Sequence, residues 1–238
     1  MKKLLLALMC MTLALFTAAC SDSGSKTENK QEETKKDEET KKQEETKKDE
    51  ENKEDEKDKD EDSTMPGSVE GGKKYTAVIS VDGYGDITLT LDEGIAPKTV
   101  DNFVKLANEG FYDGLTFHRI MDGFMIQGGD PEGNGTGGSD ETIEGEFLSN
   151  GFKNTLSHKK GVISMARSQN PNSASSQFFI VESDSEFLDG EYAAFGYVTD
   201  GMDIVEKIAE DAKPVDSNGT IDPTEQPVIT SITVTEAE

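Results

Sequence analysis

Two short segments combine polar and large apolar side chains in a way that could do chemistry. The segment FHRIMDGFMIQGGD, residues 117–130, places Arg119 close to Phe124, Met125 and Gln127. The segment SSQFFI, residues 175–180, sets a second glutamine beside two phenylalanines. Arginine is a permanent cation with five N–H donors, and glutamine both donates and accepts hydrogen bonds. These residue types indicate a site that holds a substrate by hydrogen bonds in apolar surroundings.

Other residue groups do not support covalent, phosphate or metal chemistry. The serines of the segment SASSQ lack a nucleophile-elbow pattern, and the chain has only 2 histidines, His118 and His158. No cysteine lies near either histidine, so we expect no metal site. The segment GNGTGG, residues 133–138, is not followed by the lysine and helix start of a phosphate loop, so it is predicted to be a surface loop.

The two segments resemble the active-site signature of the cyclophilin family of peptidyl-prolyl cis–trans isomerases. The resemblance covers nearly all of residues 75–235 in order, and it implies no cofactor. It implies that Arg119 is the catalytic residue. Taken alone, an arginine here would more often pair with an acid at the surface, and the apolar residues would be core. The joint occurrence of FHRI, FMIQGGD, SSQFFI and FLDG favours the functional interpretation. By the same resemblance, the substrate-binding residues are Phe124, Met125, Gln127, Ala166, Arg167, Gln177, Phe179, Phe187, Leu188 and Tyr192.

Isomerisation of a prolyl bond needs no nucleophile and no metal. Its barrier of about 18–20 kcal/mol arises because the nitrogen lone pair is delocalised into the carbonyl. An arginine that donates toward the prolyl nitrogen in a dry pocket lowers this barrier, while an apolar basin holds the ring. One well-placed donor is worth about 3–4 kcal/mol, and a 10⁵-fold acceleration needs about 7 kcal/mol. Arg119 is therefore expected to supply about half of the lowering of the barrier.

Three positions depart from the family pattern. Phe187 stands where many eukaryotic members have tryptophan, and because the chain has no tryptophan we expect weak binding of cyclosporin. Tyr192 stands where many members have histidine, and either ring can form a pocket wall. Arg167 stands where the family has an asparagine that binds substrate through its main chain, so activity is expected to survive, with an altered preference for the residue before proline.

Hydrophobic periodicity predicts many short strands and only two helices. A hairpin is expected from Tyr75–Val81 and Asp86–Leu91. A helix begins at Pro97 and stops before Gly110, and a second covers Met202–Glu210. Further strands are predicted at 115–120, 124–127, 162–166, 178–182, 194–198 and 228–235. Periodicity favours a closed or sandwiched antiparallel sheet. The resemblance implies an all-β-dominated fold, a closed eight-stranded antiparallel barrel capped by a helix at each end.

The N-terminus has the pattern of a secretory signal. Lys2 and Lys3 precede an apolar run, residues 4–16, which is shorter than the roughly 20 residues of a membrane-spanning helix. Cys20 follows two alanines, which resembles the lipobox of bacterial lipoproteins despite Thr17. We therefore expect residues 1–19 to be removed and Cys20 to carry a diacylglyceryl group, with ordinary cleavage and a free thiol as the alternative.

The next segment is predicted to be a tether. Residues 21–62 contain 11 lysines and 19 acidic residues without an aromatic one, so this stretch cannot form a core. Its QEETKK-type repeat favours a partly helical, otherwise disordered chain. We expect the lipidated tether to cover residues 20–72 and the isomerase domain residues 73–238. Residues 63–238 contain 11 of the basic and 30 of the acidic residues, a net charge of −19. Nucleic acid and anionic lipid are therefore not expected as partners, and the membrane is contacted only through the N-terminal lipid.

These observations predict an extracytoplasmic, lipid-anchored isomerase. Its partners are expected to be proline-containing segments of unfolded or secreted proteins, whose folding it assists. The alternative is a tethered peptide-binding module or chaperone with the same groove and little turnover.

Overall fold

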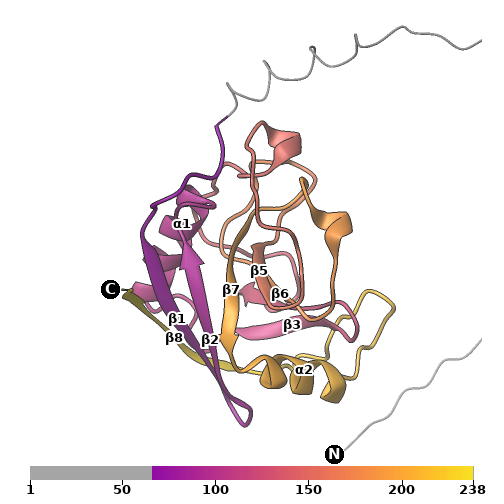
Figure 1. The fold of residues 1–238 in the computed structure, drawn as a ribbon. Coiled ribbons are helices and arrows are strands. Elements are labelled where there is room, and N and C mark those ends of the chain that lie inside the picture. The colour runs from indigo at the N-terminus through magenta and orange to yellow at the C-terminus, as the bar shows by residue number, and fades with distance from the viewer. Residues whose placement is uncertain (1–65, 238) are drawn as a thin grey trace, which may run out of the picture. The chain divides into compact units, whose positions relative to one another are not determined.

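The computed structural model describes residues 66–237. The predicted signal segment, Cys20 and the tether up to residue 65 lie outside the described residues, and so does Glu238. Figure 1 shows the described residues as a curled sheet with two α-helices. The elements are β1 (Lys74–Val81), β2 (Gly85–Asp92), α1 (Pro97–Asn108), β3 (Thr116–Met121), β4 (Met125–Asp130), β5 (Val162–Met165), β6 (Phe178–Val181), β7 (Ala194–Asp200), α2 (Met202–Asp211) and β8 (Ile229–Glu236), with short 3₁₀ turns at Leu148–Asn150 and Glu186–Leu188.

The eight strands form one antiparallel sheet in the order β3-β4-β6-β5-β7-β2-β1-β8. Its two end strands approach each other through the segment that leads into β8. The N–H of Ile229 donates to Leu115 O at 2.8 Å, and the N–H of Phe117 donates to Pro227 O at 2.9 Å. The predicted strands, their antiparallel pairing and the two helices are confirmed. Closure of the barrel is only partial, because these contacts do not extend into a continuous ladder.

Both helices turn their apolar faces to one core inside the curled sheet. Val100 and Phe103 of α1, and Val205 and Ile208 of α2, are fully buried in this core. In Figure 1, α1 and α2 lie toward opposite ends of the sheet. The N-terminal end of α1 has no side-chain cap of its own, since Ala96 precedes Pro97.

A carboxylate from a distant loop replaces the missing cap. Glu146 Oε1 accepts the N–H of Lys98 at 3.1 Å, and Oε2 accepts the N–H and Oγ of Thr99 at 2.9 and 2.7 Å. A negative group at this end also suits the helix dipole. The side chain is buried, so these bonds hold the 144–157 loop firmly against α1.

The chain joins the folded domain earlier than the predicted boundary at residue 73. The N–H of Ser68 donates to Lys153 O at 2.9 Å, and the N–H of Lys153 donates to Pro66 O at 2.8 Å. Ser68 Oγ also donates to Ile95 O at 3.0 Å. Residues 66–69 therefore pack as an arm on the domain surface.

Candidate active site

The strand register brings the predicted site residues into one row on the outer face of the sheet. Arg119 of β3 is opposite Gln127 of β4, which is opposite Phe179 of β6, which is opposite Ser164 of β5. Met125 lies two residues from Gln127 and therefore on the same face. Residues between them, such as Ile126, point into the core.

A β-bulge at His118 decides which way Arg119 points. Phe117 pairs with Gly128 and Arg119 with Gln127, so His118 is an extra residue in β3. With strict alternation, Phe117 and Arg119 would share a face, and Phe117 belongs to the core. The extra residue lets Phe117 and His118 both be buried while Arg119 turns outward.

The guanidinium of Arg119 is held from two sides. Its Nε donates to Asn218 O at 2.7 Å, and its Nη1 donates to Gln127 Oε1 at 3.0 Å. Among the described residues it forms no salt bridge, so the surface ion pair considered for this arginine does not exist there. Burial lowers the pKa of Arg119, and the charges of Tyr192 and Asp216 partly offset this effect. An arginine starts from so high a pKa that it stays a cation at neutral pH.

The two predicted glutamines continue this hydrogen-bond chain along the groove. Gln127 Nε2 donates to Gln177 Oε1 at 2.9 Å, and Gln177 Nε2 donates to Gly137 O at 2.7 Å. These partners assign the orientation of both amides. Each amide has further hydrogen-bonding capacity, which an extended peptide can use.

Next to the guanidinium lies a pocket of about 320 Å³. Met125, Phe179 and Leu188 are buried in a small apolar cluster beneath it. The ring of Tyr192 meets that of Phe179 edge-on, with 5.8 Å between centroids. Every residue that lines the pocket was predicted from the sequence: Arg119, Phe124, Met125, Gln127, Ala166, Arg167, Phe179, Phe187, Leu188 and Tyr192.

Gln177 lies in a neighbouring hollow of about 380 Å³ that shares Gln127, Ala166 and Arg167 with the pocket. The glycine-rich segment 133–138, predicted only as a surface loop, contributes one wall of this hollow. A side chain at position 137 would meet Asp130 Oδ1, which accepts the N–H of Glu132 at 2.8 Å, while Oδ2 of the same carboxylate accepts the N–H of Asn134 at 3.1 Å. The glycine thus permits a tight loop against the groove.

Phe187 and Arg167 differ from the other lining residues in their exposure and in their side-chain contacts. Phe187 is 72 % exposed and stands at the rim, with its ring 5.6 Å from that of Phe124. The guanidinium of Arg167 lies 4.9 Å from the ring centroids of both Phe147 and Tyr192. Its Nε donates to Glu191 O at 2.9 Å, and only 14 % of the side chain is exposed. The Arg167 side chain thus braces the Tyr192 wall.

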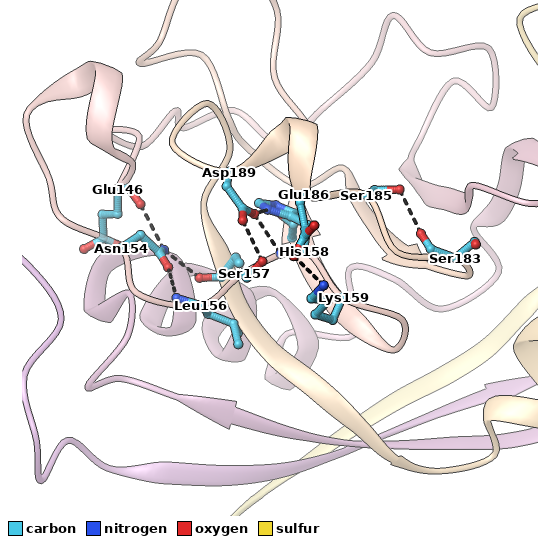
Figure 2. Close-up of polar contacts among 12 residues, drawn as sticks. Glu146, Asn154, Leu156, Ser157, His158, Lys159, Ser183, Ser185, Glu186 and Asp189 are labelled. Atoms are coloured by element: carbon cyan, nitrogen blue, oxygen red, sulfur yellow. Dashed lines mark hydrogen bonds and ion pairs between the residues drawn. The ribbon is translucent and has the colours of Figure 1, made fainter. Parts of the chain in front are cut away.

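Figure 2 shows a hydrogen-bonded network in which His158 and Asp189 face each other. The buried His158 ring lies against Phe179. His158 Nδ1 is 2.7 Å from Asp189 Oδ1, and its Nε2 is 3.0 Å from Ser164 Oγ. Burial lowers the pKa of His158, and Asp189 opposes that effect, so the neutral ring donates through Nδ1 and accepts from Ser164. The imidazole stacks on the ring of Phe179 at 6.1 Å. Ser164 is fully buried, so this Ser-His-Asp set does not face a substrate and instead supports the pocket floor.

Sequence reasoning missed Asn218, Glu146 and the link between His158 and Asp189. Asn218 is 99 residues from Arg119 along the chain, and it acts through its main-chain carbonyl, which leaves no residue-type signal.

The described residues contain no group of three or more His, Cys, Asp or Glu side chains that could hold a metal. Between residues 66 and 237, neither helix is long and apolar enough to cross a membrane.

The comparisons with known proteins agree with this geometry. Residues 76–234 match the family model described as "Cyclophilin type peptidyl-prolyl cis-trans isomerase/CLD". Peptidyl-prolyl cis-trans isomerase B of Escherichia coli (strain K12) is 42% identical over 162 residues, which are 64% of this chain and 96% of that protein. A probable peptidyl-prolyl cis-trans isomerase of Brucella suis is 43% identical over 149 residues, which are 58% of this chain and 72% of that protein.

A solved structure gives the same result. The cyclophilin type peptidyl-prolyl cis-trans isomerase of Cryptosporidium parvum, crystallised in the presence of the dipeptide Ala-Pro, superimposes with a TM-score of 0.59. It is 31% identical, and the match covers 68% of this chain and 99% of that chain. The family model spans more than half of the chain and coincides with the strands that carry the site. The chain therefore belongs to the cyclophilin-type peptidyl-prolyl cis–trans isomerases and is an enzyme with that activity.

Proposed function

We propose that Arg119 and the adjoining apolar pocket catalyse rotation about the peptide bond before proline in extended segments of protein substrates. The observation that carries this proposal is that a guanidinium held by two hydrogen bonds to oxygen lies beside a pocket of about 320 Å³ with an apolar floor. The Nε and one Nη1 hydrogen of Arg119 bond to oxygen atoms, and the other Nη contacts are to the sulfurs of Met121 and Met125. Thioether sulfur is a weak acceptor, so these Nη hydrogens can donate to a substrate instead. Donation to the prolyl nitrogen stabilises its pyramidal form and weakens conjugation with the carbonyl.

The pocket holds one side of the bond while the other turns. Met125, Phe179 and Leu188 supply an apolar floor whose shape is supported by the buried His158 network. Gln127 and Gln177 bind the substrate backbone, and the main chain of Arg167 offers a further contact beside them. Backbone recognition tolerates varied side chains, which suits an enzyme that acts on many unfolded clients.

A protease-coupled assay of a proline-containing tetrapeptide tests this function. We expect a rate well above the uncatalysed isomerisation, which takes tens to hundreds of seconds. The sharpest comparison is with Arg119→Ala, which should bind the same peptide and lose most turnover. If the wild-type protein binds the peptide without accelerating its isomerisation, the groove is that of a binding module.

We further propose that the enzyme works outside the cytoplasm, anchored by lipid on Cys20, and assists the folding of secreted or surface proteins. The lysines at the start of the chain, its apolar run and the cysteine after two alanines support this location. Two acyl chains provide stable anchoring where a single chain is marginal. The acidic repeat after Cys20 supports a spacer between the lipid and the domain.

Mass spectrometry of the mature N-terminus tests the anchor. A diacylglyceryl-modified Cys20 at the first position is the expected result, and Cys20→Ser should release the protein from the membrane fraction. An unmodified N-terminus elsewhere, with the protein still membrane-bound, would contradict the proposal.

A further inference from the structure

The Nε–H of Arg119 donates to the carbonyl of Asn218, which belongs to a loop that no sequence motif identified. We propose that Asp216 is a positioning residue for the isomerase reaction: its carboxylate shapes the loop of residues 215–220 so that the Asn218 carbonyl fixes the plane of the Arg119 guanidinium. This inference rests on the proposed role of Arg119. It assigns a function to a loop that lies far from β3 and β4 in the sequence.

The carboxylate of Asp216 organises the whole turn. Its Oδ1 accepts the N–H groups of Asn218 and Thr220 at 2.9 and 3.1 Å, and its Oδ2 accepts Thr220 Oγ at 2.9 Å. The bonds from Thr220 and from the main chain of the turn lower the pKa of Asp216, so the acceptor is ionised at neutral pH. Because the N–H of Asn218 is tied to Asp216, the peptide plane that follows Asn218 is constrained as well, and it carries the carbonyl that faces Arg119.

The loop is also tied to β3 on either side of Arg119. The N–H of Ile120 donates to Gly219 O at 2.8 Å, and the N–H of Ile221 donates to His118 O at 3.0 Å. Gly219 has a φ of 84°, and a Cβ there would lie 2.5 Å from Met121 Cγ and 2.6 Å from Ile120 O. The close approach that delivers the Asn218 carbonyl therefore requires glycine at position 219.

Two anchors are needed to orient a guanidinium. Besides the bond from Nη1 to Gln127, Nη2 donates to Met121 Sδ at 3.2 Å and Nη1 to Met125 Sδ at 3.7 Å. Thioether sulfur is a weak acceptor, so these contacts leave the group room to tilt, whereas the bond from Nε to Asn218 O defines its plane. The direction of the remaining Nη hydrogens, which face the sulfurs of Met121 and Met125, is then fixed as well. Small errors in the position of a catalytic group can cost about 10²-fold in rate.

Steady-state kinetics of three variants of the full chain test the inference. Asp216→Ala should lower kcat about tenfold or more with little change in KM, because the substrate pocket itself is intact. Asp216→Asn keeps an acceptor for the two N–H groups and should restore most of the lost kcat. Asp222→Ala is the matched control, since Asp222 accepts the N–H of Thr224 at 2.9 Å in a similar turn without contacting Arg119. An unchanged kcat in Asp216→Ala, an equal loss in Asp222→Ala, or no rescue by asparagine would overturn the proposal.

Nuclear magnetic resonance provides a readout independent of turnover. Arg119 and Arg167 are the two arginines of the chain, so the ¹⁵N-arginine Nε region contains two signals. Asp216→Ala should shift the Arg119 Nε–H signal and speed its exchange with water, while Arg167, whose Nε donates to Glu191 O, remains as the internal reference. An unchanged Arg119 signal would refute the positioning role. Full activity in Arg119→Ala would instead refute the proposed function, so the two failures are distinct.

Discussion

Replacing Arg119 with lysine separates the charge of the guanidinium from its geometry. Lysine keeps the positive charge but carries its donors on a single nitrogen. In the structure the guanidinium reaches Asn218 O with one nitrogen and Gln127 Oε1 with another. An ammonium group cannot make both contacts at these distances and also donate to the prolyl nitrogen.

The expected magnitudes follow from this geometry. Removal of a single donor to developing charge lowers turnover by about 10²–10³-fold in other enzymes, or about 2.7–4 kcal/mol. We expect Arg119→Ala to lose kcat/KM within this range and Arg119→Lys to lose at least about tenfold. Stability should change little, by about 1 kcal/mol, because only a few hydrogen bonds of a half-buried side chain are lost.

The assay is protease-coupled cleavage of a proline peptide, with urea unfolding to check the fold. Lys207→Ala is the control for a lost positive charge, since Lys207 pairs with Asp211 on the exposed face of α2. It should keep wild-type activity. Wild-type activity in Arg119→Lys would refute the argument from geometry, and wild-type activity in Arg119→Ala would refute any catalytic role.

Three further outcomes are expected. Glu146→Ala should lower the free energy of unfolding, measured in urea, by about 2–4 kcal/mol, because it leaves buried donors of Thr99 and the start of α1 unpaired. Glu146→Gln should lower it less, and equal losses in the two variants would contradict a capping role. Burial lowers the pKa of His118 and of His158, so below about pH 6.5 the unfolded chain binds protons that the folded chain does not. As the pH is lowered from 7.5 to 5.5, the free energy of unfolding should therefore fall by up to about 1.4 kcal/mol per histidine. His118→Gln should reduce this pH dependence. A wild-type free energy of unfolding that does not change over this range would contradict the argument. Phe187→Trp should bind cyclosporin about three- to tenfold more tightly than the wild-type protein. The fluorescence of the introduced indole reports the binding, and an unchanged affinity would contradict this expectation.

Most helices and strands of the fold could be predicted from local sequence patterns. The glycine-containing turn at residues 82–85 and the alternation on either side predicted β1 and β2, and Pro97 and Gly110 bounded α1. Local patterns could not reveal which strands are neighbours, since β7 pairs with β5 and β2 rather than with β6. The partial closure of the sheet was also beyond local patterns, because it depends on a few contacts between residues 115–117 and 227–229.

The candidate site shows the same division. The residues that line the pocket were all identified from sequence, since they lie in or next to short motifs that resemble those of the family. They could not identify Glu146, whose contact with Thr99 spans 47 residues, or the carbonyl of Asn218. The influence of the Arg167 side chain on substrate preference stays a prediction, while the structure adds its contacts with the rings of Phe147 and Tyr192, which no motif had indicated.

By itself, the sequence determined the family, the chemical groups of the candidate site and the charged composition of residues 21–62, because these depend on residue types at short spacing. Only the tertiary structure decided where those groups point. The bulge at His118 turns Arg119 outward, the strand register aligns it with Gln127 and Phe179, and the loop of Asp216 supplies its second anchor. The physical reason is that a side chain takes its direction from the pairing of its strand, and pairing joins residues that are distant along the chain.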